Sequence, residues 1–294
     1  MDIATLIASN GALSRADLDM ARDALAGVGA MPGDIVWIDE GVAADVPFGR
    51  IDRGSARAAL EGLLPGIDVV VQPAAGRAKQ LLVADMDSTM ITIECIDELA
   101  DYAGIKPQIA EVTERAMRGE LDFAAALDAR VGLLKGLAAS AIDRCLAERV
   151  CPSPGAETLV KTMRARGALT ILVSGGFTRF AEPVGARLGF ERVIANRLMI
   201  DGDALAGTVE KPIVDSSTKE STLLGAMAEL GLAETETLAV GDGANDLAMI
   251  RKAGLGVAYR AKPIVAAAAG ARLDHFDLTG LLYAQGIARS DWVA

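Results

Sequence analysis

The chain has 294 residues, of which 51% are hydrophobic and 23% charged, a balance typical of globular proteins with a substantial core. Its formal net charge of −11 disfavours nucleic acids and anionic membrane surfaces as partners, and no apolar run approaches the ~18 residues that span a bilayer. The amino terminus lacks the basic start and long apolar stretch of a signal peptide, so we expect a cytoplasmic protein.

Residues 1–76 are predicted to form a small α/β unit in the approximate order β-α-β-β-α-β. Strands are indicated near 3–8, 34–38, 46–48 and 67–71, and helices near 14–26 and 55–63. This order resembles an ACT-like regulatory module, which implies an amino-acid-sensing or dimerising role. The segment contains no recognisable ligand motif, which leaves a purely structural role at least equally open. Residues 72–79 form a credible linker.

Residues 77–294 are predicted to form a doubly wound α/β domain with a parallel sheet. Short apolar segments alternate with helical patterns, which is typical of β-α-β units with right-handed crossovers. Strands are expected at 81–84, 168–173, 192–195, 237–240 and 255–258, helices at 155–166, 177–188, 217–230 and 245–252, and a hairpin over 197–209. A helical stretch at about 94–152 interrupts this domain after its first strand, and we interpret it as an inserted cap.

The rare residue types exclude several kinds of site. A Ser-His-Asp triad would have to use His275, the single histidine, whose surroundings favour a structural or surface role. Cys95, Cys145 and Cys151 have no metal-ligand spacing and are expected to be reduced thiols. Acid–base and metal chemistry must therefore fall mainly to carboxylates and lysine.

Two carboxylates directly follow the first strand of the predicted parallel sheet. Asp85 and Asp87 lie two residues apart and so share one side of an extended segment, at the strand end where such sheets bind ligands. Asp85 can attack phosphorus as a covalent nucleophile. Asp87, whose protonated form is favoured among other carboxylates, can give a proton to the leaving oxygen and later take one from water. The same pair also occurs on ordinary solvated turns, so its position after a buried strand carries the prediction.

A second acidic cluster follows the strand predicted at 237–240. Asp242 and Asp246 offer hard oxygen ligands suited to Mg²⁺, and the spacing of four can bring both to one ion. In isolation the same residues would serve as a helix cap. With the carboxylate of Asp85 and the backbone carbonyl of Asp87, they predict a magnesium site in which Asp246 is a direct or an outer ligand.

Two further clusters supply what an acidic protein needs in order to bind a phosphate. Ser174 and Gly175 follow another predicted strand and offer a hydroxyl and an unhindered N–H ahead of a helix. A glycine-rich turn with a serine cap explains the same residues equally well. Lys219 lies near the start of a helix, where lysines are usually solvated, but among aspartates it can stabilise a phosphoryl transition state.

The four clusters resemble, in order and spacing, the motifs of the haloacid dehalogenase-like (HAD-like) phosphatases over residues 80–294. The matching residues are Asp85-x-Asp87-Ser88-Thr89, Ser174-Gly175-Gly176, Lys219 and Gly241-Asp242-Gly243-x-Asn245-Asp246. The resemblance implies a Rossmannoid core, Mg²⁺ as cofactor and an aspartyl-phosphate intermediate.

Three strings in the predicted cap are similar to the cap of phosphoserine phosphatases. They span residues 93–100, 117–123 and 129–134. The similarity implies that Glu94 contacts the substrate ammonium and that Arg130 binds its carboxylate through a bidentate fork. Met117 and Phe123 would close an apolar wall, and Asn245 would help to bind the substrate.

The leading hypothesis is hydrolysis of O-phospho-L-serine to L-serine and phosphate, the last step of serine biosynthesis. A relative acting on another small phosphate, or transferring the phosphoryl group to an alcohol such as homoserine, is the enzymatic alternative. A sensor of amino acids with a vestigial catalytic domain is the alternative from another class. The intact set of Asp85, Asp87, Lys219 and Asp242 argues against the sensor.

Overall fold

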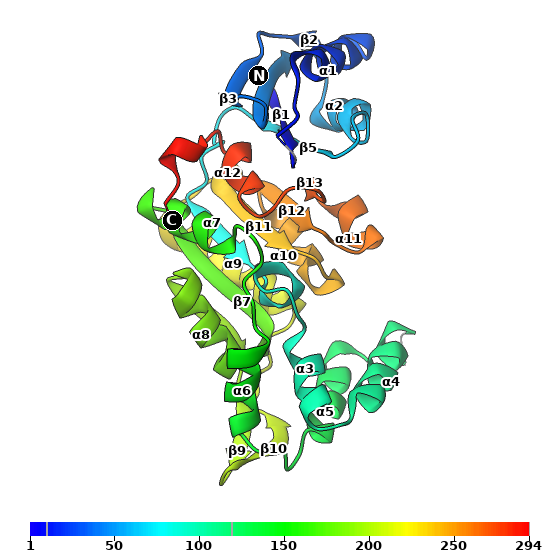
Figure 1. Cartoon of the computed structure of the whole chain (residues 1–294), viewed down its shortest axis with the longest axis vertical. Coiled ribbons are helices and arrows are strands. Elements are labelled where there is room, and N and C mark those ends of the chain that lie inside the picture. Colours follow the sequence, from blue (N-terminus) through cyan, green and yellow to red (C-terminus); the bar gives the residue numbers. More distant parts are fainter. Residues whose placement is uncertain (10, 119, 294) are drawn as a thin grey trace.

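The computed structural model describes residues 1–9, 11–118 and 120–293, with only the backbone of Met117 included. Figure 1 shows a small N-terminal unit at one end of the molecule, a central sheet flanked by helices, and a group of helices with a hairpin at the other end. No helix within the described ranges is long and apolar enough to cross a membrane.

The N-terminal unit is an antiparallel sheet of five strands with two helices packed against it. Its elements are β1 (Asp2–Ala8), α1 (Arg15–Gly27), β2 (Met31–Pro32), β3 (Val36–Asp39), β4 (Ala43–Gly49), α2 (Arg53–Leu60) and β5 (Ile67–Pro73). The order β2-β4-β1-β5, with β3 also paired to β4, is that of a split β-α-β fold. The predicted element order is confirmed, and β2 is an additional strand too short to produce an alternating pattern. The likeness to an ACT module stays a prediction.

The central sheet has six parallel strands in the order β13-β12-β11-β6-β7-β8, as predicted for a doubly wound α/β core. Its strands are β6 (Leu81–Ala84), β7 (Leu169–Phe177), β8 (Arg192–Asn196), β11 (Thr237–Gly241), β12 (Leu255–Tyr259) and β13 (Ala271–Leu273). Its helices are α7 (Ala156–Ala165), α8 (Thr178–Leu188), α9 (Ser216–Leu230), α10 (Leu247–Lys252), α11 (Pro263–Ala268) and α12 (Gly280–Ala284). The three-residue β13 was missed because it is too short to show a pattern.

Strand β6 is buried on both faces of this sheet and lies between β11 and β7. Leu82 and Ala84 belong to a core cluster that includes residues of α7 and α8. Leu81 and Val83 belong to a second cluster, which includes residues of α9 and α10. The alternation follows from the two-residue period of a strand, and it explains why the segment is continuously apolar. Asp85 therefore lies at the carboxyl end of a central strand.

In its described residues, the stretch predicted as an inserted cap contains four helices. They are α3 (Cys95–Tyr102), α4 (Lys106–Met117), α5 (Phe123–Leu133) and α6 (Ser140–Glu148). The chain enters and leaves this group side by side, because Ile91 and Pro152 form an isolated β-bridge. The predicted hairpin is confirmed as β9 (Leu198–Asp201) and β10 (Ala204–Val209). It packs against α5, and Lys211 pairs with Asp128 of α5 at 2.8 Å.

Buried polar contacts join the N-terminal unit to the central domain. Arg77, which follows β5, forms an ion pair with Asp45 of β4 and donates to the carbonyl of Ala284 at 2.8 Å. Asp68 of β5 accepts backbone N–H bonds from residues 274–276. In Figure 1 this interface lies at the end of the sheet away from α3–α6.

Candidate active site

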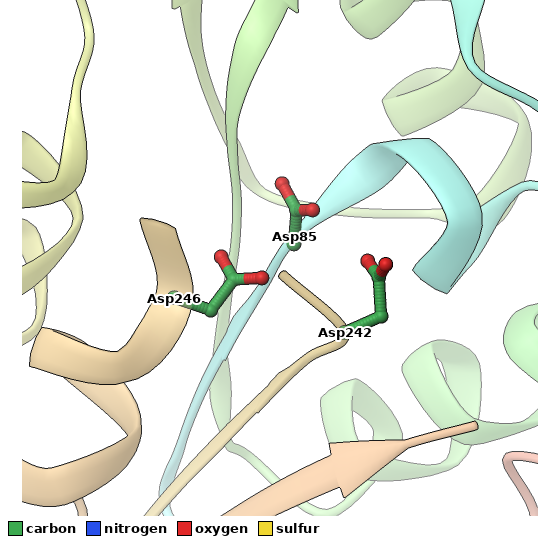
Figure 2. Close-up of side chains that lie close together, drawn as sticks. All are labelled: Asp85, Asp242 and Asp246. Atoms are coloured by element: carbon green, nitrogen blue, oxygen red, sulfur yellow. The ribbon is translucent and has the colours of Figure 1, made fainter. Parts of the chain in front are cut away.

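Three carboxylates converge at the carboxyl edge of the central sheet (Figure 2). Asp85 follows β6, and Asp242 and Asp246 follow the neighbouring strand β11. One oxygen atom from each carboxylate lies within 4.8 Å of the others. Carboxylate oxygens gathered in this way fit a small hard cation such as Mg²⁺.

Backbone and hydroxyl groups hold two of these carboxylates in place. Thr89, in the turn η1 (Met86–Met90), donates to Oδ1 of Asp242 at 3.0 Å. The N–H of Gly243 donates to Oδ2 of Asp246 at 3.0 Å. The Asp-x-Asp-Ser-Thr pattern contains Thr89, but its bond to Asp242 depends on which strands are neighbours, which the pattern does not reveal.

Lys219 of α9 is completely buried at this cluster. Its Nζ donates to Oδ1 of Asp85 at 2.5 Å and to Oδ1 of Asp246 at 2.6 Å. Burial alone lowers the pKa of Lys219, but the two carboxylates outweigh burial and raise the pKa overall, so the amine is charged. The lysine is therefore paired and desolvated, in contrast to a typical surface lysine.

The carboxylates of the cluster repel one another. Burial raises the pKa of Asp85 well above its usual range, and the charge of Asp246 raises it further against the effect of Lys219. Burial and Asp246 also raise the pKa of Asp242 to about 6. Three carboxylates and one lysine leave the cluster short of positive charge, which favours the binding of a cation.

Asp87 lies beside this cluster and points toward the end of β7. A Cβ atom on Gly176 would lie 3.0 Å from Oδ2 of Asp87. Burial and the nearby charge of Glu94 raise the pKa of Asp87 to about 7, against hydrogen bonds from Cys95. A carboxyl group with this pKa is partly protonated at neutral pH, as a proton donor must be.

The residues predicted to cradle a phosphate, Ser174 and Gly175, lie near the carboxyl end of a strand that is longer than expected. Strand β7 continues to Phe177 and α8 begins at Thr178, so the expectation that the strand ends at residue 173 was wrong. The pairing between β7 and β8 is interrupted by a bulge after Ser174 and starts again at Phe177, so β7 extends past the bulge. Because they are predicted to contact a phosphate, we call residues 174–176, where the pairing of the strand is interrupted, the phosphate loop.

The phosphate loop approaches the cap closely. The N–H of Gly176 donates to Oγ of the buried Ser174 at 2.8 Å. A Cβ atom on Gly175 would lie 3.3 Å from Cζ of Phe123, the first residue of α5. A larger residue at position 175 would therefore press against the cap, and glycine allows the close approach.

Two opposite charges of the cap lie near Asp87. Glu94 is exposed and accepts a hydrogen bond from Oγ of Ser88 at 2.7 Å. Arg130 is half-buried, and its Nε donates to the carbonyl of Ala126 at 3.3 Å. Burial lowers the pKa of Arg130, and the nearby carboxylates of Asp97, Glu94 and Asp87, in decreasing order of effect, oppose this change. Among the described residues no carboxylate forms an ion pair with Arg130, which leaves its guanidinium available to a ligand.

Asn245 and His275 lie in different parts of the structure. Asn245 is half-buried in the turn η3 (Ala244–Asp246), and a Cβ atom on Gly243 would collide with its amide oxygen. The side chain of Met117 lies outside the described residues. The backbone N–H of His275 donates to Asp68 at the interface with the N-terminal unit, which fits the predicted structural role.

Comparison with known proteins agrees with the family resemblance of the sequence motifs, both for a family model and for individual relatives. Residues 82–251 match the family model of the haloacid dehalogenase-like hydrolases. A phosphoserine phosphatase of Streptomyces coelicolor is 44% identical over 236 residues, covering 79% of this chain and 57% of that protein. A probable phosphoserine phosphatase of Schizosaccharomyces pombe is 44% identical over 211 residues, covering 71% of this chain and 70% of its own. This chain thus spans little more than half the length of the Streptomyces relative.

The fold of the whole chain also has a solved counterpart. The unliganded crystal structure of a probable phosphoserine phosphatase from Vibrio cholerae superposes with a TM-score of 0.78 at 33% identity, covering 99% of this chain and 88% of that one. The similarity therefore includes the N-terminal unit as well as the central sheet and its cap.

Proposed function

Because the chain belongs to the haloacid dehalogenase-like hydrolases, we propose that it hydrolyses O-phospho-L-serine to L-serine and phosphate. The names of its relatives support this substrate, and so does one feature of the site. Arg130 is half-buried, and no described carboxylate forms an ion pair with it. Both Arg130 and Glu94 lie near Asp87. A phosphorylated amino acid presents a carboxylate and an ammonium group beside its phosphate. The charges of Arg130 and Glu94 are opposite to those of these two groups.

The first half of the reaction forms a covalent phosphoenzyme. A carboxylate oxygen of Asp85 attacks phosphorus, and the bond between phosphorus and the serine oxygen breaks. Asp87 gives its proton to the leaving oxygen, in keeping with a pKa raised to about 7. Lys219 holds Asp85 at 2.5 Å and offsets charge that develops during the transfer.

The second half of the reaction releases phosphate. Asp87, now ionised, takes a proton from water, and the resulting hydroxide attacks the phosphorus of the aspartyl-phosphate. The bond from phosphorus to Asp85 breaks and the carboxylate is restored. Two chemically easier steps replace one difficult displacement.

The acidic cluster would hold the magnesium ion that this family implies. The ligands would be the carboxylates of Asp85 and Asp242 and the backbone carbonyl of Asp87, with Asp246 as a direct or an outer ligand. When bound, Mg²⁺ neutralises charge on the phosphoryl oxygens. The shortage of positive charge at the three converging carboxylates supports this assignment.

The cap would select the amino-acid part of the substrate. Arg130 would bind its carboxylate through two parallel hydrogen bonds and Glu94 would bind its ammonium group. Phe123, which approaches Gly175, would close the site toward water together with Met117. Ser174, Gly175, Lys219 and Asn245 would contact the phosphate side.

The direct test is phosphate release from O-phospho-L-serine with and without Mg²⁺. We expect turnover that requires Mg²⁺ and that exceeds turnover of phosphorylated sugars and of other phosphorylated amino acids. Preference for another small phosphate would contradict the proposed substrate. An assay with homoserine as acceptor separates hydrolysis from phosphoryl transfer, because transfer yields a new phosphate ester instead of free phosphate.

We also propose the division of the chain into an N-terminal domain over residues 1–76 and a phosphatase domain over 77–294 with its cap at about 94–152. The separate sheet and hydrophobic cluster of the first segment support this division. A cytoplasmic location, and a homodimer formed through an ACT-like domain, belong to the same proposal. Sedimentation of the full chain with and without L-serine tests the last point, since a monomer at all concentrations would contradict it.

A further inference from the structure

The phosphate loop lies where β7 loses its pairing with β8. The register shifts between the pairs Ser174–Ala195 and Phe177–Asn196, so the two intervening glycines have no partner residue in the described part of β8. Such a bulge leaves backbone groups outside the hydrogen-bond ladder of the sheet. Groups in a partly buried position need other partners, because an unpaired buried carbonyl costs free energy.

The side chain of Asn196 takes the place of the missing ladder bond. Asn196 is the last residue of β8, it is 2% exposed, and its Nδ2 donates to the carbonyl of Gly175 at 2.8 Å. The N–H of the same peptide unit belongs to Gly176 and donates to Oγ of Ser174. The peptide unit between the two glycines is therefore held at both its oxygen and its nitrogen. Glycines lack a side chain that would restrict their backbone, so this restraint must come from outside.

The same amide group also binds the chain just before the helix that carries Lys219. Oδ1 of Asn196 accepts the N–H of Val214 at 2.7 Å, and Nδ2 donates to the carbonyl of Val214 at 3.3 Å. This pairing sets the orientation of the amide, since the N–H of Val214 requires an acceptor. Val214 precedes Asp215, the N-cap residue of α9, whose side chain accepts the N–H of Thr218 at 2.9 Å. Lys219 follows directly in the first turns of α9.

We propose that Asn196 is a positioning residue that fixes the phosphate loop relative to the helix bearing Lys219. One amide joins two segments that must meet the same phosphate, one at the end of β7 and one at the start of α9. Without it, the peptide unit of the phosphate loop is held only at its nitrogen, by Ser174. Its orientation relative to Lys219 is then less restricted, so the loop and the lysine no longer reliably address one phosphate group. This inference rests on the proposed function, because it concerns the phosphate side of that site.

The substitution Asn196→Asp tests the donor role directly. It replaces Nδ2 by an oxygen that faces the carbonyls of Gly175 and Val214, while Oδ1 can still accept the N–H of Val214. Asn196→Ala removes the amide without adding a charge, and it serves if Asn196→Asp does not fold. The matched control is Thr237→Val. Thr237 is fully buried at the other end of β11, accepts the N–H of Gly254 at 3.0 Å and donates to the carbonyl of Glu234 at 2.7 Å.

The decisive measurement is the binding of inorganic phosphate to the full chain in the presence of Mg²⁺, by calorimetry, with thermal unfolding recorded beside it. We expect the variants of Asn196 to bind phosphate about tenfold more weakly or worse, and to raise KM for the phosphate ester in parallel. Thr237→Val should lower the melting temperature to a similar degree and leave phosphate binding unchanged.

The outcomes separate this inference from the proposed function. Wild-type phosphate affinity in both Asn196 variants, with a lowered melting temperature, would show a merely structural role and overturn the inference while the proposed function stands. Wild-type protein that binds phosphate but does not hydrolyse O-phospho-L-serine would overturn the proposed substrate. The inference would then be decided by the phosphate affinity of the Asn196 variants. Wild-type protein that neither binds phosphate nor hydrolyses O-phospho-L-serine would overturn both.

Discussion

The charges at the sheet edge and the charges on the cap are held in opposite ways. Lys219 is completely buried and contacts two carboxylates, Asp85 and Asp246, at 2.5 and 2.6 Å. Glu94 is exposed and Arg130 half-buried, and among the described residues Arg130 has no ion-pair partner. The charges of the first group are already paired within the protein, whereas under the proposed function the second group is completed by the substrate.

This difference matches the different tasks that the proposed function gives to the two regions. Groups that stabilise a transition state act best when they are fixed in advance in a desolvated site. Groups that recognise a substrate gain from being unpaired, because a partner within the protein would compete with the ligand. We therefore expect loss of Lys219 from the sheet edge to affect chemistry and stability together, and changes on the cap to affect substrate affinity alone.

Asp85→Asn should have the largest effect on activity. The amide cannot form an aspartyl-phosphate, so turnover should fall by roughly 10⁴-fold or more. The substitution keeps the shape of the side chain and removes a carboxylate whose pKa is raised by burial, so the fold should remain intact. Turnover and trapping of the phosphoenzyme after an acid quench are the measurements, with thermal unfolding as control. Magnesium-dependent turnover in this variant would contradict the covalent scheme.

Lys219→Met should damage chemistry and stability at once. It leaves Asp85 and Asp246 buried without their cation, which costs about 3–5 kcal/mol in the free energy of unfolding. Loss of one stabilising charge should also lower turnover by about 10²–10³-fold. Urea unfolding and steady-state kinetics measure the two effects.

The matched control for this lysine is Lys211→Met. Lys211 pairs with Asp128 at 2.8 Å, but both side chains are more than half exposed, at 53% and 51%. An exposed pair contributes about 0–1 kcal/mol, so this variant should unfold almost like the wild type. Equal loss of stability in both variants would contradict the contrast between buried and exposed pairs.

Arg130→Ala should change affinity without changing stability. Loss of the hydrogen bonds to the substrate carboxylate should raise KM for O-phospho-L-serine by about 10- to 100-fold. Phosphoethanolamine lacks that carboxylate, so its kcat/KM should be the same in the variant and the wild type. Steady-state kinetics with both substrates make the comparison. A matching loss on both substrates would show that Arg130 does not read the carboxylate.

The sheet edge was predictable from sequence because its determinants are local. A strand buried on both faces, such as β6, is continuously apolar, and the acids after β6 and β11 therefore fall at the carboxyl ends of their strands. That these two strands are neighbours is a long-range feature that the structure adds. The role of Asn196 was not predictable, because it depends on a register shift between β7 and β8 that leaves no mark in the alternation of side chains. The surroundings of Arg130 likewise depend on how helices of the cap pack, and the predicted end of β7 was wrong for the same reason as Asn196 was missed.

Glu94→Gln should have the smallest effect and so tests the contrast most finely. Glu94 is exposed, so its attraction for the substrate ammonium is weakened by water and salt, and KM should rise by about 3- to 10-fold. Raising the ionic strength should reduce the difference in KM between the variant and the wild type, because salt screens the interaction that the variant lacks. The difference for Arg130→Ala should respond less, since that side chain is half-buried. If the effect of Glu94→Gln equals that of Arg130→Ala and does not respond to salt, the two charges act as one desolvated pair, and the cap is as preorganised as the sheet edge.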